Sequence, residues 1–201
     1  MIAIIDYGMG NLASVNNAFL KLGYETCTTS DPEEVVNADR VVLPGVGAFA
    51  DAVMNLCDRG LDKAVYEVIK RNKPLLGICL GLQLLFSESE ENGTNRGLDV
   101  FKGRVVKFRP PPGFKVPHMG WNEVRPVPGA RLFANIPHGG YFYFVHSYYV
   151  LPEDSSSIAA RSDYGLDFVC AVENGNIFAT QFHPEKSGEL GLKILSNFAR
   201  I

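Results

Sequence analysis

The sequence predicts an α/β fold with a mostly parallel central sheet flanked by helices and a second half rich in strands. In the first half, apolar runs of strand length alternate with amphipathic stretches of helical length, which is typical of parallel strands joined by crossover helices. In the second half, apolar runs follow one another without helices between them. A chain of 201 residues, 46% of them hydrophobic, can bury a full core, so we expect one domain over residues 1–201.

Each element of the first half is predicted from the spacing of its apolar residues and from the residues that end it. Gly23 ends the first helix, because glycine readily adopts the conformation that follows a helix. The expected strands are residues 2–6, 25–29, 40–44 and 74–76. The expected helices are residues 12–22, 48–57, 61–72 and 82–86.

The second half is predicted to consist of strands separated by polar or Pro- and Gly-rich segments. Residues 173–176 supply a hairpin turn around Asn174-Gly175. The aromatic run at residues 141–144 is interpreted as a buried strand and not as a stacking platform for bases. The expected strands are residues 101–108, 141–145, 157–161, 168–173 and 176–180, with linkers at 88–96, 109–113 and 126–129 and a closing helix at 190–199.

Composition and charge exclude several classes of function. The net charge of −3 gives no electrostatic case for binding nucleic acid or an anionic membrane surface. The N-terminus has the character of a first strand and not of a signal peptide, and no apolar run reaches membrane-spanning length. Four scattered cysteines in a chain without an export signal indicate reduced thiols in the cytoplasm. Three of them, Cys27, Cys57 and Cys170, lack an accompanying motif and are interpreted as core or incidental residues.

The segment Gly77-Ile78-Cys79-Leu80-Gly81 has the pattern of a nucleophile elbow, a sharp turn from a strand into a helix. The glycines relieve crowding and tolerate a positive φ. We expect the Cys79 sulfur to be exposed at the carboxyl edge of the sheet, beside the positive helix end, which would favour a thiolate below the usual cysteine pKa of about 8.5. The alternative is a buried apolar cysteine in an ordinary strand–helix turn.

A second segment, Gln181-Phe182-His183-Pro184-Glu185, supplies a base and a carboxylate. In an extended backbone His183 and Glu185 share a face, because residues two apart point the same way. His183 would take the Cys79 proton, and Glu185 would fix the imidazole tautomer. By itself His-x-Glu is weak evidence and is more often a surface pair.

With these motifs the chain resembles the triad (class I) glutamine amidotransferases. Within that family it is similar to the glutaminase subunits of imidazole glycerol phosphate synthase, of histidine biosynthesis, which the block at residues 117–122 singles out. The resemblance implies the class I amidotransferase fold and hydrolysis of glutamine to glutamate and ammonia without a cofactor. The matching blocks, spread over nearly the whole chain, are residues 6–11, 43–49, 77–83, 117–122, 143–148 and 181–187.

The resemblance also implies roles for further residues. The oxyanion would be held by the backbone N–H of Leu80 and by the Gly45–Gly47 loop, in which Val46 and Gly47 are the candidate donors. Glutamine contacts would come from Gln83, Glu91, Ser147 and Tyr148. For Glu91 the alternative is a solvated position in the acidic loop at residues 88–91.

The expected partner is a separate (β/α)₈ cyclase subunit, with which the chain would form a heterodimer. The cyclase would use the ammonia to make imidazole glycerol phosphate and AICAR from a phosphorylated ribulosyl aminoimidazole carboxamide (PRFAR). Trp121 could instead be an ordinary core residue. The candidate docking residues are Met9, Asn11, Met119, Trp121 and Asn122.

Other interpretations remain open from the sequence. The chain could be the glutaminase of another amidotransferase pathway, or a non-catalytic dinucleotide-binding module. Residues 8–13 satisfy the dinucleotide-binding pattern G-x-G-x-x-A, and Asp31 lies where a ribose-binding acid is expected. A different thiol hydrolase of similar fold, such as a peptidase or γ-glutamyl hydrolase, is a further alternative. The four histidines lack zinc-site spacing, so no metal is expected. His146 is either a second histidine near the site or a structural imidazole.

Overall fold

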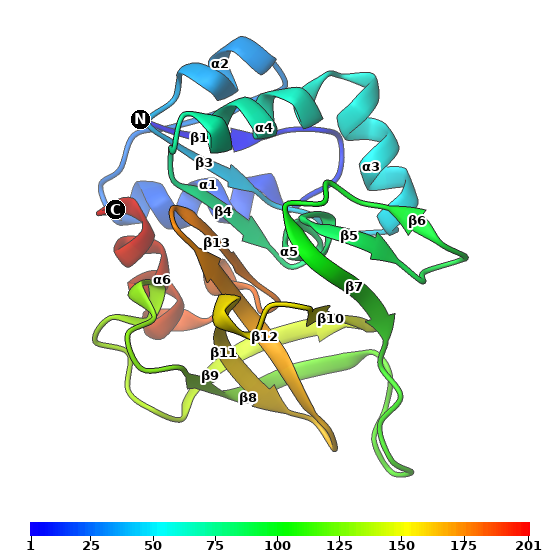
Figure 1. The fold of residues 1–201 in the computed structure, drawn as a ribbon. Coiled ribbons are helices and arrows are strands. Elements are labelled where there is room, and N and C mark those ends of the chain that lie inside the picture. The colour runs from blue at the N-terminus through cyan, green and yellow to red at the C-terminus, as the bar shows by residue number, and fades with distance from the viewer.

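A sheet of 13 strands organises the computed structural model, which describes all of residues 1–201 (Figure 1). Its strands follow the order β2-β1-β3-β4-β13-β12-β10-β7-β5-β6, with β11, β8 and β9 attached through β12. The neighbours β2, β1, β3, β4 and β13 are all parallel, whereas β12, β10, β11, β8 and β9 pair antiparallel. This arrangement confirms the predicted fold class.

In the first half, strands and helices mostly alternate along the chain, except that α4 follows α3 and β6 follows β5 directly. The strands are β1 (Ile2–Ile5), β2 (Thr26–Thr29), β3 (Arg40–Leu43), β4 (Leu75–Ile78), β5 (Phe86–Ser89) and β6 (Asn95–Arg96). The helices are α1 (Leu12–Lys21), α2 (Pro32–Asn37), α3 (Phe49–Asp58), α4 (Leu61–Lys70) and α5 (Leu80–Leu84).

The second half consists of longer strands and ends in one helix. The strands are β7 (Phe101–Lys107), β8 (His118–Pro126), β9 (Gly140–His146), β10 (Tyr148–Pro152), β11 (Ile158–Asp163), β12 (Asp167–Asn174) and β13 (Ile177–Thr180). The closing helix is α6 (Gly188–Ala199), and short 3₁₀ turns lie at Arg131–Phe133, Ser155–Ser157 and Pro184–Lys186.

Alternation along the buried strands builds a core on each face of the parallel sheet. In β1, Ala3 and Ile5 pack with the helices α2, α3 and α4, whereas Ile2 and Ile4 pack with α1 and α6. Figure 1 shows the two sets of helices on opposite sides of these strands. Burial on both faces explains why β1, β3 and β4 are mainly apolar runs. The carboxyl ends of β3 and β4 consequently meet at one edge, where ligands bind in such sheets.

Several elements differ from the predictions. The predicted helix at 82–86 begins instead at Leu80 and ends at Leu84, and Phe86 starts β5. The helix α2 was not predicted, because its six residues bury only Val35 and show no periodicity. The strand β8 was also missed: Gly120, with φ of 134°, and alternating exposed residues weaken its apolar pattern. The predicted linker at 109–113 has no helix or strand, whereas the end of β5 and all of β6 lie within the one at 88–96.

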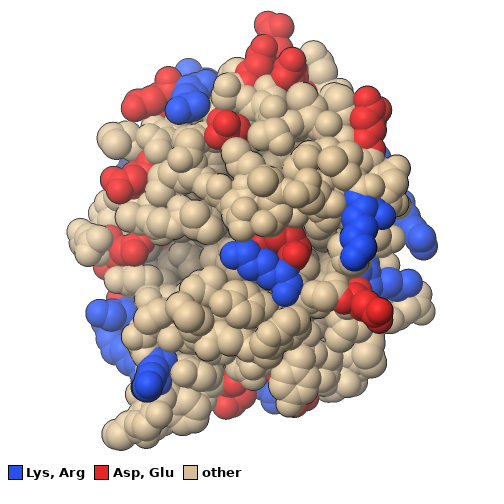
Figure 2. All heavy atoms as spheres, turned by 180° about the vertical axis from the view of Figure 1, so that it is seen from behind, with Lys and Arg blue, Asp and Glu red and all other residues tan.

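None of the helices is both long and apolar enough to cross a membrane. On the face shown in Figure 2, positive and negative side chains are interspersed among other residues and do not gather into one basic patch. This distribution agrees with the small net charge of −3.

Candidate active site

The turn between β4 and α5 has the geometry of a nucleophile elbow. Cys79 itself adopts φ 56° and ψ −107°, a strained conformation for a residue with a side chain. Of the two predicted reasons for the flanking glycines, the positive φ is therefore wrong, since neither Gly77 nor Gly81 has one, whereas the relief of crowding is confirmed. Their role is steric: a Cβ on Gly81 would overlap the Leu43 carbonyl oxygen, and one on Gly77 would lie 2.8 Å from the Gly81 oxygen.

The Cys79 side chain faces a pocket. The prediction that its sulfur is exposed is therefore wrong. Only 7% of the residue is accessible, and its sulfur contacts the Val145 carbonyl of β9 and the Gln181 side chain just after β13. The pocket has a volume of about 360 Å³. Its lining residues are Val46, Gly47, Cys79, Leu80, Gln83, Glu91, Pro117, Val145, His146, Ser147, Tyr148 and His183.

His183 lies in the same pocket as Cys79 and is held from behind by Glu185. Its Nδ1 is 2.8 Å from Glu185 Oε1, and both side chains are almost fully buried. An extended backbone was predicted to place His183 and Glu185 on one face. This reason is wrong, because β13 ends at Thr180 and Glu185 lies in the 3₁₀ turn Pro184–Lys186. The backbone N–H of His183 donates to the Tyr143 carbonyl at 2.9 Å, which ties the base to β9.

The electrostatic surroundings of His183 favour its charged form. Burial by itself would lower the pKa of the imidazole, but interactions with Cys79 and Glu185 outweigh burial and raise the pKa to about 10. The Nε2 atom has no hydrogen-bond partner in the protein. With Nδ1 engaged by Glu185, this nitrogen is the one left to exchange a proton with a ligand.

The loop that follows β3 is close to the elbow but does not leave both predicted oxyanion donors free. The Leu80 N–H donates to the Gly45 carbonyl at 3.3 Å, so in this conformation it is occupied. Val46 is 41% exposed, and Gly47 has φ of 104°. The loop is anchored by the buried Tyr7, whose hydroxyl donates to the Pro44 carbonyl at 2.9 Å.

All four predicted glutamine contacts, Gln83, Glu91, Ser147 and Tyr148, line the pocket. The alternative of a solvated surface position does not describe Glu91, because its Oε2 accepts the Phe49 N–H at 2.7 Å and caps α3. Gln83 is buried, and its Nε2 donates to the Tyr148 carbonyl at 3.2 Å.

Gln181 is a residue of this site to which the sequence analysis gave no role. It is fully buried, its Oε1 accepts from Gln83 Nε2 at 3.1 Å, and its Nε2 donates to Cys79 Sγ at 3.8 Å. The signal that could have found it is its position two residues before His183, which places both residues on one face of an extended segment.

The candidate docking residues lie in two places. Met119 and Trp121 are 60% and 56% exposed on one face of β8, so Trp121 is not a core residue. Met9 and Asn11 are partly buried in the loop between β1 and α1. Asn122 is engaged within the protein, because its Nδ2 donates to the Asp163 carbonyl at 2.7 Å.

Asp31, the acidic residue of the dinucleotide interpretation, has a local structural contact. Its Oδ1 accepts the Glu33 N–H at 2.8 Å and thereby caps the N-terminus of α2. His146 is buried next to His118, with which it shares a hydrogen bond of 2.9 Å between ring nitrogens.

Comparison with known proteins places the chain in a family. Residues 3–201 match the family model described as glutamine amidotransferase class-I. A protein of Moorella thermoacetica, named imidazole glycerol phosphate synthase subunit HisH, is 56% identical over 100% of this chain and 94% of its own length. A protein of the same name from Methanothermobacter thermautotrophicus is 53% identical over 100% of this chain and 98% of its own.

Solved structures with lower identity share the fold. The structure of PurLQS from Thermotoga maritima is similar with a TM-score of 0.75 and 17% identity, over 99% of this chain and 97% of that one. The glutaminase domain of CTPS from Trypanosoma brucei gives a TM-score of 0.67 with 20% identity, over 99% and 93% of the two chains. By its family model and its relatives, the chain belongs to the class I glutamine amidotransferases and, within them, to the family of HisH subunits of imidazole glycerol phosphate synthase.

Proposed function

We propose that this chain is the glutaminase subunit of an imidazole glycerol phosphate synthase, and that Cys79, His183 and Glu185 are its catalytic triad. The observation that carries the proposal is the position of Cys79 and His183 in one pocket, with Glu185 Oε1 2.8 Å from the far ring nitrogen of His183. A nucleophile, a base and a group that orients the base are the parts that acyl transfer needs.

In the first chemical step the Cys79 thiolate attacks the side-chain amide carbon of glutamine. A carbon–sulfur bond forms, and the C–N bond then breaks as His183 gives the Nε2 proton to the departing ammonia. The raised pKa of His183 keeps the imidazole charged at neutral pH, so this proton is available before the substrate arrives. Glu185 stabilises the imidazolium and fixes which nitrogen faces the pocket.

In the second step water attacks the γ-glutamyl thioester and releases glutamate. His183, neutral after the first step, takes a proton from the attacking water. The C–S bond then breaks and releases the Cys79 thiolate, which restores the charged pair, and the new carboxyl group gives its proton to solvent. Because Leu80 N–H is occupied by the Gly45 carbonyl, both steps require the Gly45–Gly47 loop to move before this donor can bind an oxyanion. The loop contains glycines at both ends, which makes such a change inexpensive.

Glutamine fits the chemistry of the pocket walls. Glu91 offers a carboxylate toward a substrate amine, and the backbone at Ser147 and Tyr148 offers hydrogen-bonding groups toward a carboxylate. We propose that these residues, with Gln83, orient the substrate so that its amide carbon reaches Cys79. Val46 and Gly47 are proposed to complete the oxyanion site after the loop moves.

The direct test is Cys79→Ala compared with Cys57→Ala, which removes an exposed thiol outside the pocket. Release of glutamate from glutamine should disappear in the first variant and persist in the second, with both proteins folded by circular dichroism. Unchanged glutamate release by Cys79→Ala would refute the proposed nucleophile.

We further propose that the partner is a separate cyclase subunit that docks on β8 and on the loop between β1 and α1. Met119 and Trp121 expose an apolar surface on β8, and the neighbouring strand β9 adds Tyr141, which is 56% exposed. Exposed aromatic residues and Met are enriched at interfaces. The same strand β9 holds His183 through the Tyr143 carbonyl. A partner bound to β9 would therefore contact the strand that positions the base. Asn122, Met9 and Asn11 complete the proposed surface.

The partner proposal predicts coupling between the two sites. The free chain should hydrolyse glutamine slowly, and cyclase with its bound substrate should raise the rate at least tenfold, equivalent to about 1.4 kcal/mol of activation free energy. Glutamate release measured with and without cyclase and its ligand tests this expectation, and equal rates would refute it. In the Cys79→Ala complex, synthesis from added ammonium salt should persist, because the cyclase site would lie on the other chain.

We also propose that residues 1–201 form one glutamine amidotransferase domain that works in the cytoplasm. The family model spans residues 3–201, and the four cysteines are all unpaired, which suits a reducing compartment. Limited proteolysis should release no stable fragment if this domain assignment is correct.

A further inference from the structure

A continuous series of hydrogen bonds runs from the strand β8 to the sulfur of Cys79. From the outer end, Asn122 Nδ2 contacts His118 Nε2 at 3.3 Å, and His118 Nδ1 contacts His146 Nε2 at 2.9 Å. His146 Nδ1 then contacts the Tyr148 carbonyl at 2.8 Å. This carbonyl also accepts from Gln83 at 3.2 Å.

The inner end of the series reaches the elbow through the two glutamines. Gln83 Nε2 donates to Gln181 Oε1 at 3.1 Å, and Gln181 Nε2 donates to Cys79 Sγ at 3.8 Å. Both hydrogens of Gln83 Nε2 are therefore used within the protein, and its Oε1 is the polar atom left for a ligand. The position of the Tyr148 carbonyl consequently decides how the Gln83 amide is presented to the pocket.

The direction of every hydrogen bond in the imidazole pair is fixed from both ends. At the inner end His146 Nδ1 faces a carbonyl oxygen, so it must carry the proton and leave Nε2 as an acceptor. His118 Nδ1 must then be the donor to His146, and His118 Nε2 must be an acceptor.

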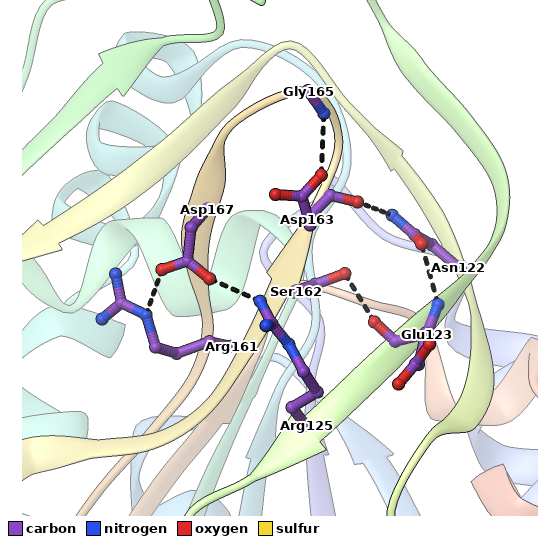
Figure 3. Close-up of polar contacts among 8 residues, drawn as sticks. All are labelled: Asn122, Glu123, Arg125, Arg161, Ser162, Asp163, Gly165 and Asp167. Carbon is purple, nitrogen blue, oxygen red and sulfur yellow. Dashed lines mark hydrogen bonds and ion pairs between the residues drawn. The ribbon is translucent and has the colours of Figure 1, made fainter.

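The outer end gives the same direction independently. Asn122 Oδ1 accepts the Glu123 N–H at 2.8 Å, and its Nδ2 donates to the Asp163 carbonyl at 2.7 Å. Figure 3 shows this side chain between the two backbone groups, beside the ion pairs that hold Arg125 and Arg161 on Asp167. These contacts orient the Asn122 amide so that its remaining N–H points to His118 Nε2.

The surroundings keep both imidazoles neutral and in place. Burial lowers the pKa of His118 to about 4 and that of His146 to about 3. The His118 ring stacks between Tyr164 and Phe144, with centroid distances of 4.0 and 4.9 Å. A protonated imidazole at either position would set two N–H groups against each other, so the network exists only for the neutral pair.

We propose that His118 is a positioning residue of the glutamine site, which acts through His146 on the Tyr148 carbonyl and thereby on the orientation of Gln83. The inference rests on the proposed glutaminase function and extends it to a residue outside the pocket lining. It also gives β8, the proposed docking strand, a hydrogen-bonded connection to the substrate site. His118 touches neither substrate nor sulfur. Because it acts through Gln83, a proposed substrate contact, its effect is expected mainly on substrate binding.

Two substitutions separate hydrogen bonding from packing. His118→Phe keeps the stacked ring but removes both hydrogen bonds. His118→Asn removes the ring but places an amide N–H where the imidazole Nδ1–H lies. We expect the KM for glutamine to rise about tenfold in His118→Phe, because of its two lost hydrogen bonds only the buried one to His146 leads to the substrate site, with kcat within about threefold of wild type. His118→Asn should have the lower thermal unfolding midpoint and the lower KM of the two.

Phe168→Leu provides the matched packing control, because Phe168 contacts the His118 and His146 rings without a hydrogen bond. It should lower the unfolding midpoint and leave the KM unchanged. The proposal is overturned if His118→Phe has wild-type KM, or if KM in the three variants simply follows the loss of stability.

A spectroscopic measurement tests the network without relying on glutamine turnover. Long-range ¹H–¹⁵N correlation spectra at pH 7 should show neutral His118 and His146, each protonated on Nδ1, whereas free imidazole side chains favour the Nε2–H form. An Nε2–H tautomer or an imidazolium at either residue would overturn the proposal. If the tautomers are as expected but wild-type protein does not hydrolyse glutamine, the proposed function fails and the network stands.

Discussion

The two halves of the molecule hold their site residues by different means. In the first half, Cys79 is fixed by backbone geometry: a strained φ of 56° between two positions where a Cβ would collide with backbone oxygens. In the second half, His183 is fixed by side-chain and backbone hydrogen bonds to Glu185 and Tyr143. The nucleophile therefore depends on the space around its turn, whereas the base depends on polar partners. Substitutions in the two halves should fail in different ways.

The largest expected effect comes from the second half, where His183 is held by polar partners and can be misoriented without loss of the fold. Glu185→Gln keeps the shape of the side chain but removes the charge that stabilises the His183 imidazolium. We expect kcat for glutamine to fall on the order of 10⁴-fold, as is typical when the orienting carboxylate of a triad becomes an amide. Steady-state glutamate release measures this loss. A decrease of less than about tenfold would show that His183 does not need its partner.

The next largest effect is expected in the first half, where the elbow is fixed by the space around it, and it concerns stability. Gly81→Ala places a methyl group on the Leu43 carbonyl oxygen, so β3 or the elbow must shift. We expect a loss of about 3 kcal/mol or more in the free energy of unfolding. Gly175→Ala is the matched control in the turn between β12 and β13, where a Cβ meets nothing within 4 Å and only the left-handed φ of 55° is strained. The control should lose about 1–2 kcal/mol, and equal losses in urea denaturation would contradict the steric account.

A smaller effect tests the electrostatic contact between the halves. Cys79→Ser removes the sulfur whose interactions help to raise the pKa of His183 to about 10, so this pKa should fall. A pH titration of the His183 ring resonances measures the change. An unchanged pKa would show that Cys79 and His183 do not interact electrostatically.

The same pKa fixes the sign of a pH dependence of stability. Because the folded-state pKa lies above the ordinary value of 6.5, the charged imidazole stabilises the fold fully below pH 6.5, and this stabilisation is lost as the pH rises toward 10. The difference in unfolding free energy between wild type and His183→Gln should therefore shrink over this range. A difference in unfolding free energy that grows with pH would contradict the raised pKa of His183.

The smallest effect on basal chemistry is expected at the surface of the second half. Trp121→Ala removes an exposed side chain of β8, so basal glutamate release should change by less than about twofold, whereas binding of the cyclase should weaken by about 1–2 kcal/mol. Met54→Ala, which truncates a similarly exposed side chain on α3, should change neither quantity. Calorimetric titration with cyclase distinguishes the two variants, and an unchanged affinity for Trp121→Ala would remove this residue from the docking surface.

The two halves also differ in how much the sequence reveals. The elbow was predictable, because Gly77, Cys79 and Gly81 are close in sequence and their spacing reports a local backbone constraint. The pairing of His183 with Glu185 was predicted too, although the reason given, an extended strand, was wrong. Local patterns identify residues more reliably than they identify the conformation that brings those residues together.

Contacts between distant segments had no local signal. Gln181 is 98 residues from Gln83, and His118 is 28 residues from His146, so only the assembled sheet shows that these side chains form one hydrogen-bond series. The occupation of the Leu80 N–H by the Gly45 carbonyl was likewise not predictable, because it depends on the conformation of a glycine-containing loop from another strand. Motifs predicted which residues matter, and tertiary structure supplied how they are held.

We propose that glutamine binds in the pocket between the two halves and reacts with Cys79. The most direct test is covalent labelling with an electrophilic diazoketone analogue of glutamine, followed by mass spectrometry of the digested protein. We expect one label per chain, on Cys79, with a labelling rate that falls when glutamine is added. Labelling of Cys27 or Cys57 in preference to Cys79, or a rate that glutamine does not change, would contradict it.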